Sequence, residues 1–144
     1  MHGRASCKSL NSRHYSQIDK QLVKMNKDQH PLALQENLSR AKYIVSFISV
    51  LSPDSTGYED AANQMMETVQ NQLGFVAAYS ARNADGVGIT ISYWTNLEAV
   101  TGWKKNKAHQ AIQKKGKNQW YDWYQLQVSE IVRGNEGGRL QAAE

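Results

Sequence analysis

The chain is poor in cysteine and proline: its 144 residues include one cysteine, Cys7, and two prolines. A single cysteine excludes an internal disulfide and a cysteine-rich zinc module, and it favours a reducing cytoplasm as the location. Ten glycines and two prolines are too few for a collagen-like or low-complexity chain. No apolar run reaches the roughly 18 residues of a membrane span, and residues 1–30 lack the apolar stretch of a signal peptide.

Positive charge is concentrated at the N-terminal end. The net charge is +4, and residues 1–40 carry seven basic and three acidic side chains, so the rest of the chain, with ten of each, is neutral. The sequence after residue 40 contains no RNA-recognition motif with paired aromatic residues. We therefore predict no nucleic-acid partner.

Composition divides the chain into three segments. Residues 1–40 form a basic extension, in which an amphipathic pattern over 16–27 predicts one helix followed by a linker. A mobile tail and a helix that docks on the domain or on a second subunit are both compatible with this pattern. Residues 41–134 carry the apolar patterns of one domain, and residues 135–144 are a loose tail.

Hydrophobic periodicity predicts alternating strands and helices within the domain. Runs of β-branched and aromatic residues predict strands at 43–51, 75–82, 87–94 and about 123–133. An apolar stripe at helical spacing predicts a helix after the first strand, ended by Gly74 as a left-handed cap. A second helical region, in two pieces, precedes the last strand. Thr56-x-x-Glu59 and Thr95-x-x-Glu98 have the spacing of capping boxes for the two helical regions.

The order β-α-β-β-α-β predicts an α+β protein with the ferredoxin-like split βαβ fold, an antiparallel sheet with the helices on one face. On the first strand, Val45, Phe47 and Leu51 lie on one side, while Ile48 and Val50 lie on the other. Both faces of the sheet are therefore apolar, and one helix layer covers only one of them. We expect a homodimer that joins two sheets face to face.

Aromatic residues gather between positions 93 and 124, where all four tryptophans and three of the seven tyrosines lie. They either plug the end of the helix layer, with N–H and O–H groups bonded locally, or line a flat pocket for a small planar apolar ligand. The candidate substrate-binding residues are Trp94, Tyr93, Trp120, Tyr121 and Tyr124.

His109 is the one histidine of the domain. It is either a hydrogen-bonded surface residue or, facing the aromatic residues, a proton shuttle or axial metal ligand. No histidine, cysteine or carboxylate follows at i+3 or i+4, so we predict no zinc or non-haem iron site. Haem needs one protein ligand and stays an alternative. Six lysines between 104 and 117 form a solubilising face or attract anionic groups such as carboxylates or propionates.

The string Ile89-Thr90-Ile91-Ser92-Tyr93-Trp94 is followed by Trp103, by His109 and by Trp120-Tyr121-x-x-Tyr124. Over residues 43–133 this pattern resembles the antibiotic biosynthesis monooxygenase family. The resemblance implies a dimeric α+β barrel and activities that range from cofactor-free oxygenation of aromatic polyketides to haem degradation. Haem-degrading members use an asparagine on the first strand with a tryptophan and a histidine. Trp103 and His109 match the last two, but the first strand has no asparagine.

We predict a small monooxygenase that uses a planar aromatic or quinol substrate as its own reductant, with no metal or flavin cofactor. This chemistry requires a dry pocket, a base and donors that stabilise an oxyanion. His109, as the general base, and Trp103 are the candidate catalytic residues. The alternatives are a non-catalytic dimer that binds or senses a small ligand, and a haem-binding or haem-degrading enzyme.

Overall fold

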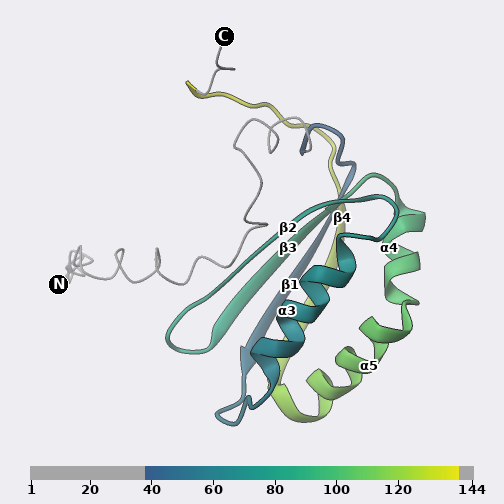
Figure 1. The fold of residues 1–144 in the computed structure, drawn as a ribbon. Helices are drawn as coiled ribbons and strands as arrows, with labels where there is room; N and C mark the ends of the chain where they lie inside the picture. Colours follow the sequence, from purple (N-terminus) through teal and green to yellow (C-terminus); the bar gives the residue numbers. More distant parts are fainter. Residues whose placement is uncertain (1–37, 140–144) are drawn as a thin grey trace, which may run out of the picture.

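A computed structural model describes residues 38–139 (Figure 1). Its strands are β1 (Tyr43–Leu51), β2 (Phe75–Arg82), β3 (Val87–Trp94) and β4 (Tyr121–Glu130). Its helices are α3 (Tyr58–Val69), α4 (Leu97–Lys104) and α5 (Lys107–Lys115), with a π-helical turn, η1 (Gly116–Trp120), before β4. The predicted helix over 16–27 and the last residues of the predicted tail lie outside the described part of the chain.

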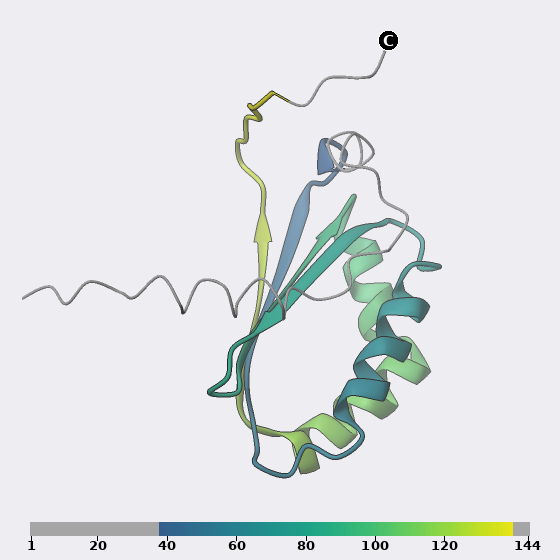
Figure 2. The same ribbon diagram turned by 60° about the vertical axis from the view of Figure 1, so that its left-hand side comes forward.

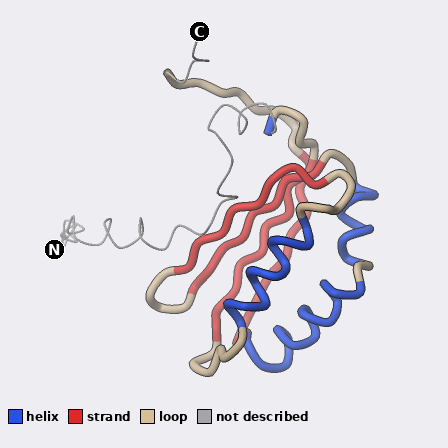
Figure 3. Tube along the Cα trace, viewed as in Figure 1, coloured by secondary structure: helices blue, strands red, loops and turns tan. Residues whose placement is uncertain are grey.

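The four strands form one antiparallel sheet in the order β2-β3-β1-β4. The helices α3, α4 and α5 all lie on one side of it, as two views show (Figures 1 and 2), and Figure 3 separates the helix layer from the sheet by colour. This arrangement confirms the predicted ferredoxin-like α+β fold. Within residues 38–139, no helix covers the other side of the sheet, and none is long and apolar enough to cross a membrane.

The first three strands have the predicted bounds, whereas the last is shifted. Strand β4 runs from Tyr121 to Glu130 rather than over 123–133, because its pairing with β1 sets both ends. Leu51 pairs with Tyr121 across a bulge, and Tyr43, the first residue of β1, pairs with Glu130. Beyond Glu130 one further hydrogen bond joins the two segments, from the Ile131 N–H to the Lys42 carbonyl at 2.8 Å, and the ladder then ends.

Both predicted capping boxes are wrong. The Thr56 hydroxyl donates instead to the Asp54 carboxylate, with 2.8 Å between the oxygens, and α3 begins after Gly57 without a side-chain cap. For α4 the cap is Asn96, whose side-chain oxygen accepts the Ala99 N–H at 2.7 Å. In the first box the Asp54 carboxylate binds both the hydroxyl and the N–H of Thr56, in the turn before the helix, and in the second the neighbouring amide occupies the capping position.

Gly74 does not end the first helix, as predicted, because α3 already ends at Val69. It lies just before β2 with a φ of 82°. Its carbonyl accepts the Thr95 N–H at 2.9 Å, and a Cβ on it would lie 2.5 Å from the Cβ of Ala99. Glycine therefore lets the chain turn into β2 while passing close to α4.

Strand register determines the side of the sheet on which each residue lies. Directly paired residues of antiparallel strands share a face, so Tyr43 and Val45 of β1 share one with Trp94 and Ser92 of β3. Tyr43 and Val45 also pack against a core cluster that includes Val69 of α3. This face is therefore the side that carries the helices.

The helix-facing side of β2 and β3 is small and polar. Between Trp94 and Arg82 it consists of Ser92, Thr90, Gly88, Ala78 and Ser80. The apolar residues of the same two strands lie on the opposite side, which we call the outer face: Tyr93, Ile91, Ile89, Val87, Tyr79 and Ala81. The helices therefore cover the side of these strands with the smaller side chains.

The outer face is open to solvent toward the β2–β3 turn, whereas at its other end Tyr79 and Tyr93 pack against the buried cluster of Ala41, Val76 and Ala77. Ile89 and Val87 are 42% and 43% exposed. Trp123, which pairs opposite Val50 and so lies on the same face, is 51% exposed. The prediction that both faces of β1 are apolar is confirmed, and the apolar surface extends across β3.

Gly74→Ala is expected to lower the free energy of unfolding by about 1–2 kcal/mol, because alanine is strained at a positive φ and its methyl would meet Ala99. Gly102→Ala in α4 is the matched control, since the nearest atom to a new Cβ there is 3.5 Å away. Gly102→Ala should keep or raise the free energy of unfolding, because alanine is favoured over glycine in a helix by about 0.5–1 kcal/mol. Urea denaturation measures both changes. A Gly74→Ala protein as stable as the wild type would contradict this account.

Candidate functional site

The structure divides the predicted site residues into two groups on the helix-facing side. The upper group consists of Trp94, Trp103 and His109, and the lower group of Trp120, Tyr121 and Tyr124. Tyr93 lies apart from both, on the outer face, where its ring meets the edge of Tyr79 with 6.1 Å between centroids.

Trp94 forms the core of the upper group. It is 1% exposed, and the Phe75 ring packs against it edge to face at 5.4 Å. Its indole N–H donates to the Ser92 hydroxyl at 2.9 Å. The Trp103 side chain packs on the same cluster, so Trp94 supports the residues that lie beside it in the helix layer.

Trp103 and His109 stack face to face, with 4.3 Å between ring centroids and 15° between planes. Asn106 begins α5 by accepting the His109 N–H, and His109 Nδ1 lies 3.0 Å from the Trp103 carbonyl oxygen. A carbonyl only accepts, so Nδ1 carries the proton in this hydrogen bond and Nε2 keeps its lone pair. Burial lowers the pKa of His109, against the opposing effect of the carbonyl. The ring is therefore a neutral base at pH 7.

The lower group surrounds Tyr58, the first residue of α3. The Trp120 ring meets Tyr58 edge to face at 5.8 Å, and its N–H donates to the Thr56 carbonyl at 2.9 Å. Tyr121 also packs against Tyr58, at 5.9 Å, and on its other side against Phe47 at 5.3 Å. Burial, together with the neighbouring Tyr58, raises the pKa of Tyr121 well above its usual range, so its phenol stays protonated.

Arg82 lies beneath Tyr58 and was missed by sequence analysis. One of its terminal nitrogens, Nη1, donates to the carbonyls of Gly86 at 2.7 Å and Ser49 at 3.2 Å. The other, Nη2, donates to the Ser49 hydroxyl at 2.9 Å and the Tyr58 hydroxyl at 3.0 Å. The guanidinium carbon also lies 5.2 Å from the centre of the Tyr58 ring. No carboxylate within residues 38–139 pairs with it.

Gly88 makes room for this cation. A Cβ on Gly88 would lie 2.4 Å from the guanidinium carbon of Arg82, so the guanidinium lies flat across β3. The sequence could have indicated this role, because Arg82 follows Ala78 and Ser80 at every second position of β2 and so lies on the side that the helices cover. A charged residue at such an inward position is uncommon unless its charge is used.

The two groups flank one strip of the sheet. Val45 contacts the upper group and Phe47 the lower, and these two residues of one strand lie about 7 Å apart. Beside them, Thr90 and Ser92 of β3 are only half-buried although the helix layer lies on this side. We call this strip of small hydroxyl side chains on β3 the floor.

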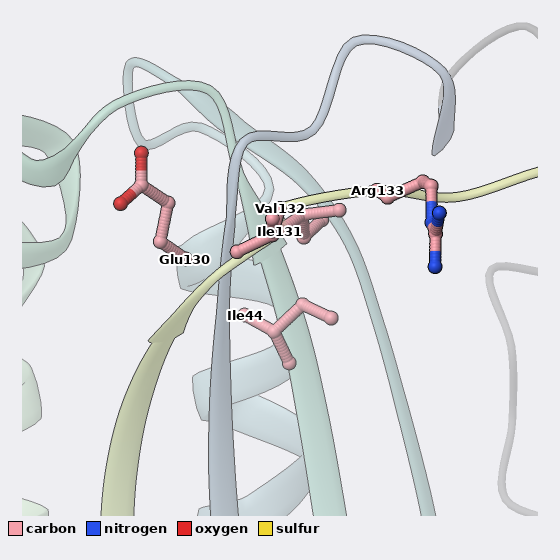
Figure 4. A pocket seen from close by; sticks show the side chains of 5 residues that line it. All are labelled: Ile44, Glu130, Ile131, Val132 and Arg133. Atoms are coloured by element: carbon pink, nitrogen blue, oxygen red, sulfur yellow. The ribbon is translucent and has the colours of Figure 1, made fainter.

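A pocket of about 610 Å³ opens on the other side of the sheet, where the chain leaves β4 (Figure 4). It is lined by Ile44, Glu130, Ile131, Val132 and Arg133. The side chains of Glu130 and Arg133 point away from each other (Figure 4). None of the predicted site residues lines this pocket, so it is separate from the two aromatic groups.

The residues do not form the tryptophan box that a haem bound to His109 would require. Trp103 covers one face of the imidazole, but Trp120 belongs to the lower group and Trp123 lies on the outer face. The described part of the chain also contains no group of three or more His, Cys, Asp or Glu side chains that could hold a metal ion.

A model of the antibiotic biosynthesis monooxygenase family matches residues 43–115, from the start of β1 to the end of α5. The chain belongs to this family. The uncharacterized protein YqjZ of Bacillus subtilis (strain 168) is 41% identical to it over 91 residues, which cover 63% of this chain and 80% of that protein. Membership agrees with the resemblance carried by the β3 string, Trp103 and His109.

Solved structures share the fold of this monooxygenase-family chain at low sequence identity. SnoaB from Streptomyces nogalater, a cofactor-independent oxygenase, is 12% identical with a TM-score of 0.57 and covers 66% of this chain and 96% of its own. PA3566 from Pseudomonas aeruginosa is 6% identical with a TM-score of 0.57 and covers 65% and 96%. These likenesses extend to the fold, and the site residues are argued from this chain alone.

The pKa of His109 is expected to lie below its ordinary value, and Trp103→Leu is expected to raise it, because the substitution removes the ring that shields the imidazole from water. In the window below the ordinary pKa, the unfolded chain binds more protons than the folded one, so stability falls as the pH falls. NMR titration of the imidazole protons measures the pKa, with His109→Gln as the assignment control. A pKa at or above the ordinary value in the wild type would contradict the burial of this ring.

Proposed function

We propose that this family member is a small monooxygenase that acts on a planar, electron-rich aromatic or quinol substrate without a metal or flavin cofactor. Its family and the cofactor-independent oxygenase SnoaB, which shares its fold, support the reaction class. The observation that carries the proposal is the floor, a strip of small hydroxyl residues between an aromatic group with a neutral histidine and an aromatic group with a cation.

The substrate would lie along the floor, over Thr90 and Ser92. The distance along β3 from Trp94 to Gly88 is about 20 Å at the usual rise of a strand, which exceeds the length of a compound with two or three fused rings. Trp103 lies at the upper end, and Tyr121 and Tyr124 lie at the lower end. Phe47 and Val45 of β1 supply apolar contact beside the hydroxyl groups.

In the reaction we propose, Nε2 of His109 removes a proton from the substrate, and hydroxyl donors stabilise the oxyanion that forms. The anion transfers one electron to dioxygen, and the resulting superoxide and substrate radical combine into a peroxide anion, which takes back the proton from His109 to give a hydroperoxide. Loss of water from the hydroperoxide leaves a carbonyl group. One oxygen atom enters the product and the other leaves as water, and the substrate supplies both electrons that reduce the second atom.

Trp103 acts as a positioning residue for the base. Its ring stacks on the imidazole and its carbonyl holds Nδ1, so the ring orientation and the tautomer are set before a substrate arrives. A base held in one orientation loses no rotational freedom on binding. Burial keeps the imidazole neutral, which is the form that accepts a proton.

The same set of residues could bind a ligand without converting it, as a sensing dimer would. The observation that favours this second candidate is that one nitrogen and one face of the His109 ring are already occupied, by the carbonyl and the indole of Trp103. An imidazole held this way also serves as a packing residue.

We also propose that a second copy of the chain covers the outer face. This face is apolar, open toward the β2–β3 turn and not covered by a helix among the described residues, and sheets that bury such a face form stable pairs. The pocket beside Ile44 lies at the margin of this surface. The location we propose, from the single cysteine, is a reducing cytoplasm.

His109→Gln is expected to lower kcat for oxidation of dithranol, a planar anthrone with an acidic C–H, by about 10²–10⁴-fold, because the substitution removes the base. Gln110→Ala, an exposed neighbour on α5, is the matched control and should retain activity. Oxygen uptake and product absorbance are recorded together, with circular dichroism to verify folding. Equal turnover by His109→Gln and wild type would exclude His109 as the base. Binding of dithranol without oxygen uptake by the wild type would favour the sensing dimer.

Ile89→Glu is expected to convert a dimer into a monomer, because a carboxylate would be buried in the centre of the joined sheets. Leu73→Glu is the control, since Leu73 is 89% exposed and lies in the loop before β2. Light scattering at micromolar concentration measures the mass of each. A wild-type monomer, or a dimer that survives Ile89→Glu, would show that this face is not the interface.

A further inference from the structure

Arg82 and the hydroxyl groups around it, beside the lower group, form a cluster that is rich in hydrogen-bond donors and poor in acceptors. A guanidinium has no acceptor atom, so the hydroxyls of Ser49 and Tyr58 must accept from Arg82. The protons of these two hydroxyls are then left to donate elsewhere. The Nε–H of Arg82 also has no partner among residues 38–139.

Tyr121 adds a further donor. Its phenol stays protonated because burial raises its pKa, and it interacts with the hydroxyl of Tyr58. The two rings pack at 5.9 Å, and within residues 38–139 neither phenol O–H donates to a hydrogen-bonded acceptor, so the pair has an O–H left to donate. The cluster therefore offers a guanidinium N–H and a phenol O–H side by side.

The positive charge in this cluster has no balancing carboxylate. The oxygen atoms that accept from Arg82 are neutral, two carbonyls and two hydroxyls, and the Tyr58 ring gives a cation–π contact at 5.2 Å. A hydrogen bond from a cation to an anion is roughly twice as strong as one between neutral groups. An anionic oxygen group would thus complete the cluster, and a neutral ligand would not.

We propose that Arg82, with the Tyr58–Tyr121 pair, binds a carboxylate on the substrate, so that the protein selects planar aromatic acids over neutral aromatics of the same shape. The inference rests on the proposed function, because it names the substrate class of that site. One carboxylate oxygen accepts the Arg82 Nε–H and the other accepts the free phenol proton. The acid then lies at the lower end of the floor and the rings extend over Thr90 toward Trp103.

The specificity follows from the position of the cluster. Ser49 is 1% exposed and holds Nη2 from the sheet side, and Gly88 lets the guanidinium lie against β3. The cation therefore has little freedom to turn outward into water. A group fixed in a partly dry site discriminates between charged and neutral ligands more strongly than a flexible surface lysine does.

Two fluorescent probes of the same ring system test the proposal: 1-hydroxy-2-naphthoate, which is an anion at pH 7.5, and 1-naphthol, which is neutral there. Fluorescence titration of the full chain measures both dissociation constants. The wild type is expected to bind the naphthoate at least about tenfold more tightly than the naphthol. Arg82→Gln should abolish this preference and leave the affinity for 1-naphthol within about twofold.

Two further variants keep the test decisive if Arg82→Gln does not fold. Tyr58→Phe retains the guanidinium and its three other oxygen contacts, and should reduce the preference severalfold. Arg133→Gln, an exposed arginine beside the outer pocket, is the control and should retain the preference. A wild type that binds neither probe, or both equally, would overturn the proposal, and so would a preference that survives both Arg82→Gln and Tyr58→Phe.

These outcomes are separable from those of the proposed function, because the titration measures binding and oxygen uptake measures turnover. Oxygen uptake without any preference for the naphthoate would leave the monooxygenase standing and remove the carboxylate site. A preference for the naphthoate that depends on Arg82, in a protein that consumes no oxygen with any substrate, would support the carboxylate site and contradict the monooxygenase.

Discussion

The antiparallel pairing of β3 with β1 is the constraint on which the rest of this molecule depends. It places Val87, Ile89 and Ile91 on the side away from the helices and Gly88, Thr90 and Ser92 beneath them. A slip of one residue would exchange the two sets completely. The helices would then pack on large apolar side chains, and the floor and the open outer face would both disappear. The site and the surface proposed for the partner are thus two results of one register.

The small residues on the helix-facing side explain why polar chemistry is tolerated inside the fold. Gly88 leaves space for the Arg82 guanidinium, and Ser49 and Tyr58 satisfy it. The aromatic residues then pack around these polar groups rather than against one another in a single cluster. The core proper is divided as well, into one cluster around Trp94 on the helix-facing side and another around Val76, which packs with Tyr79 and Tyr93 of the outer face.

The two ends of the floor have complementary chemistry. At the upper end, burial favours the neutral form of His109, which can accept a proton. At the lower end, the Arg82 guanidinium can only donate hydrogen bonds, and the Tyr58 and Tyr121 phenols beside it keep O–H groups that can donate. A planar molecule that spans both would have a proton removed at one end and its negative charge held at the other. Each effect is larger in a site with little water than on an open surface.

Local pattern by itself determined the element order, the bounds of β1, β2 and β3, and the place of Trp103 and His109 in the second helical region, because alternation and helical spacing are properties of neighbouring residues. The stacking of these two rings came from the tertiary structure. The caps at Thr56 and Thr95 were predicted wrongly, since the Asp54 carboxylate two residues away binds the Thr56 hydroxyl and N–H, and the Asn96 amide beside Thr95 accepts the helix N–H in its place. The separation of Trp120, Tyr121 and Tyr124 from Trp94, the outward position of Tyr93, and the role of Arg82 were decided only by the tertiary structure. Strand order and register bring Ser49, Tyr58, Arg82 and Gly88 together from four elements, and no spacing within one element encodes that meeting.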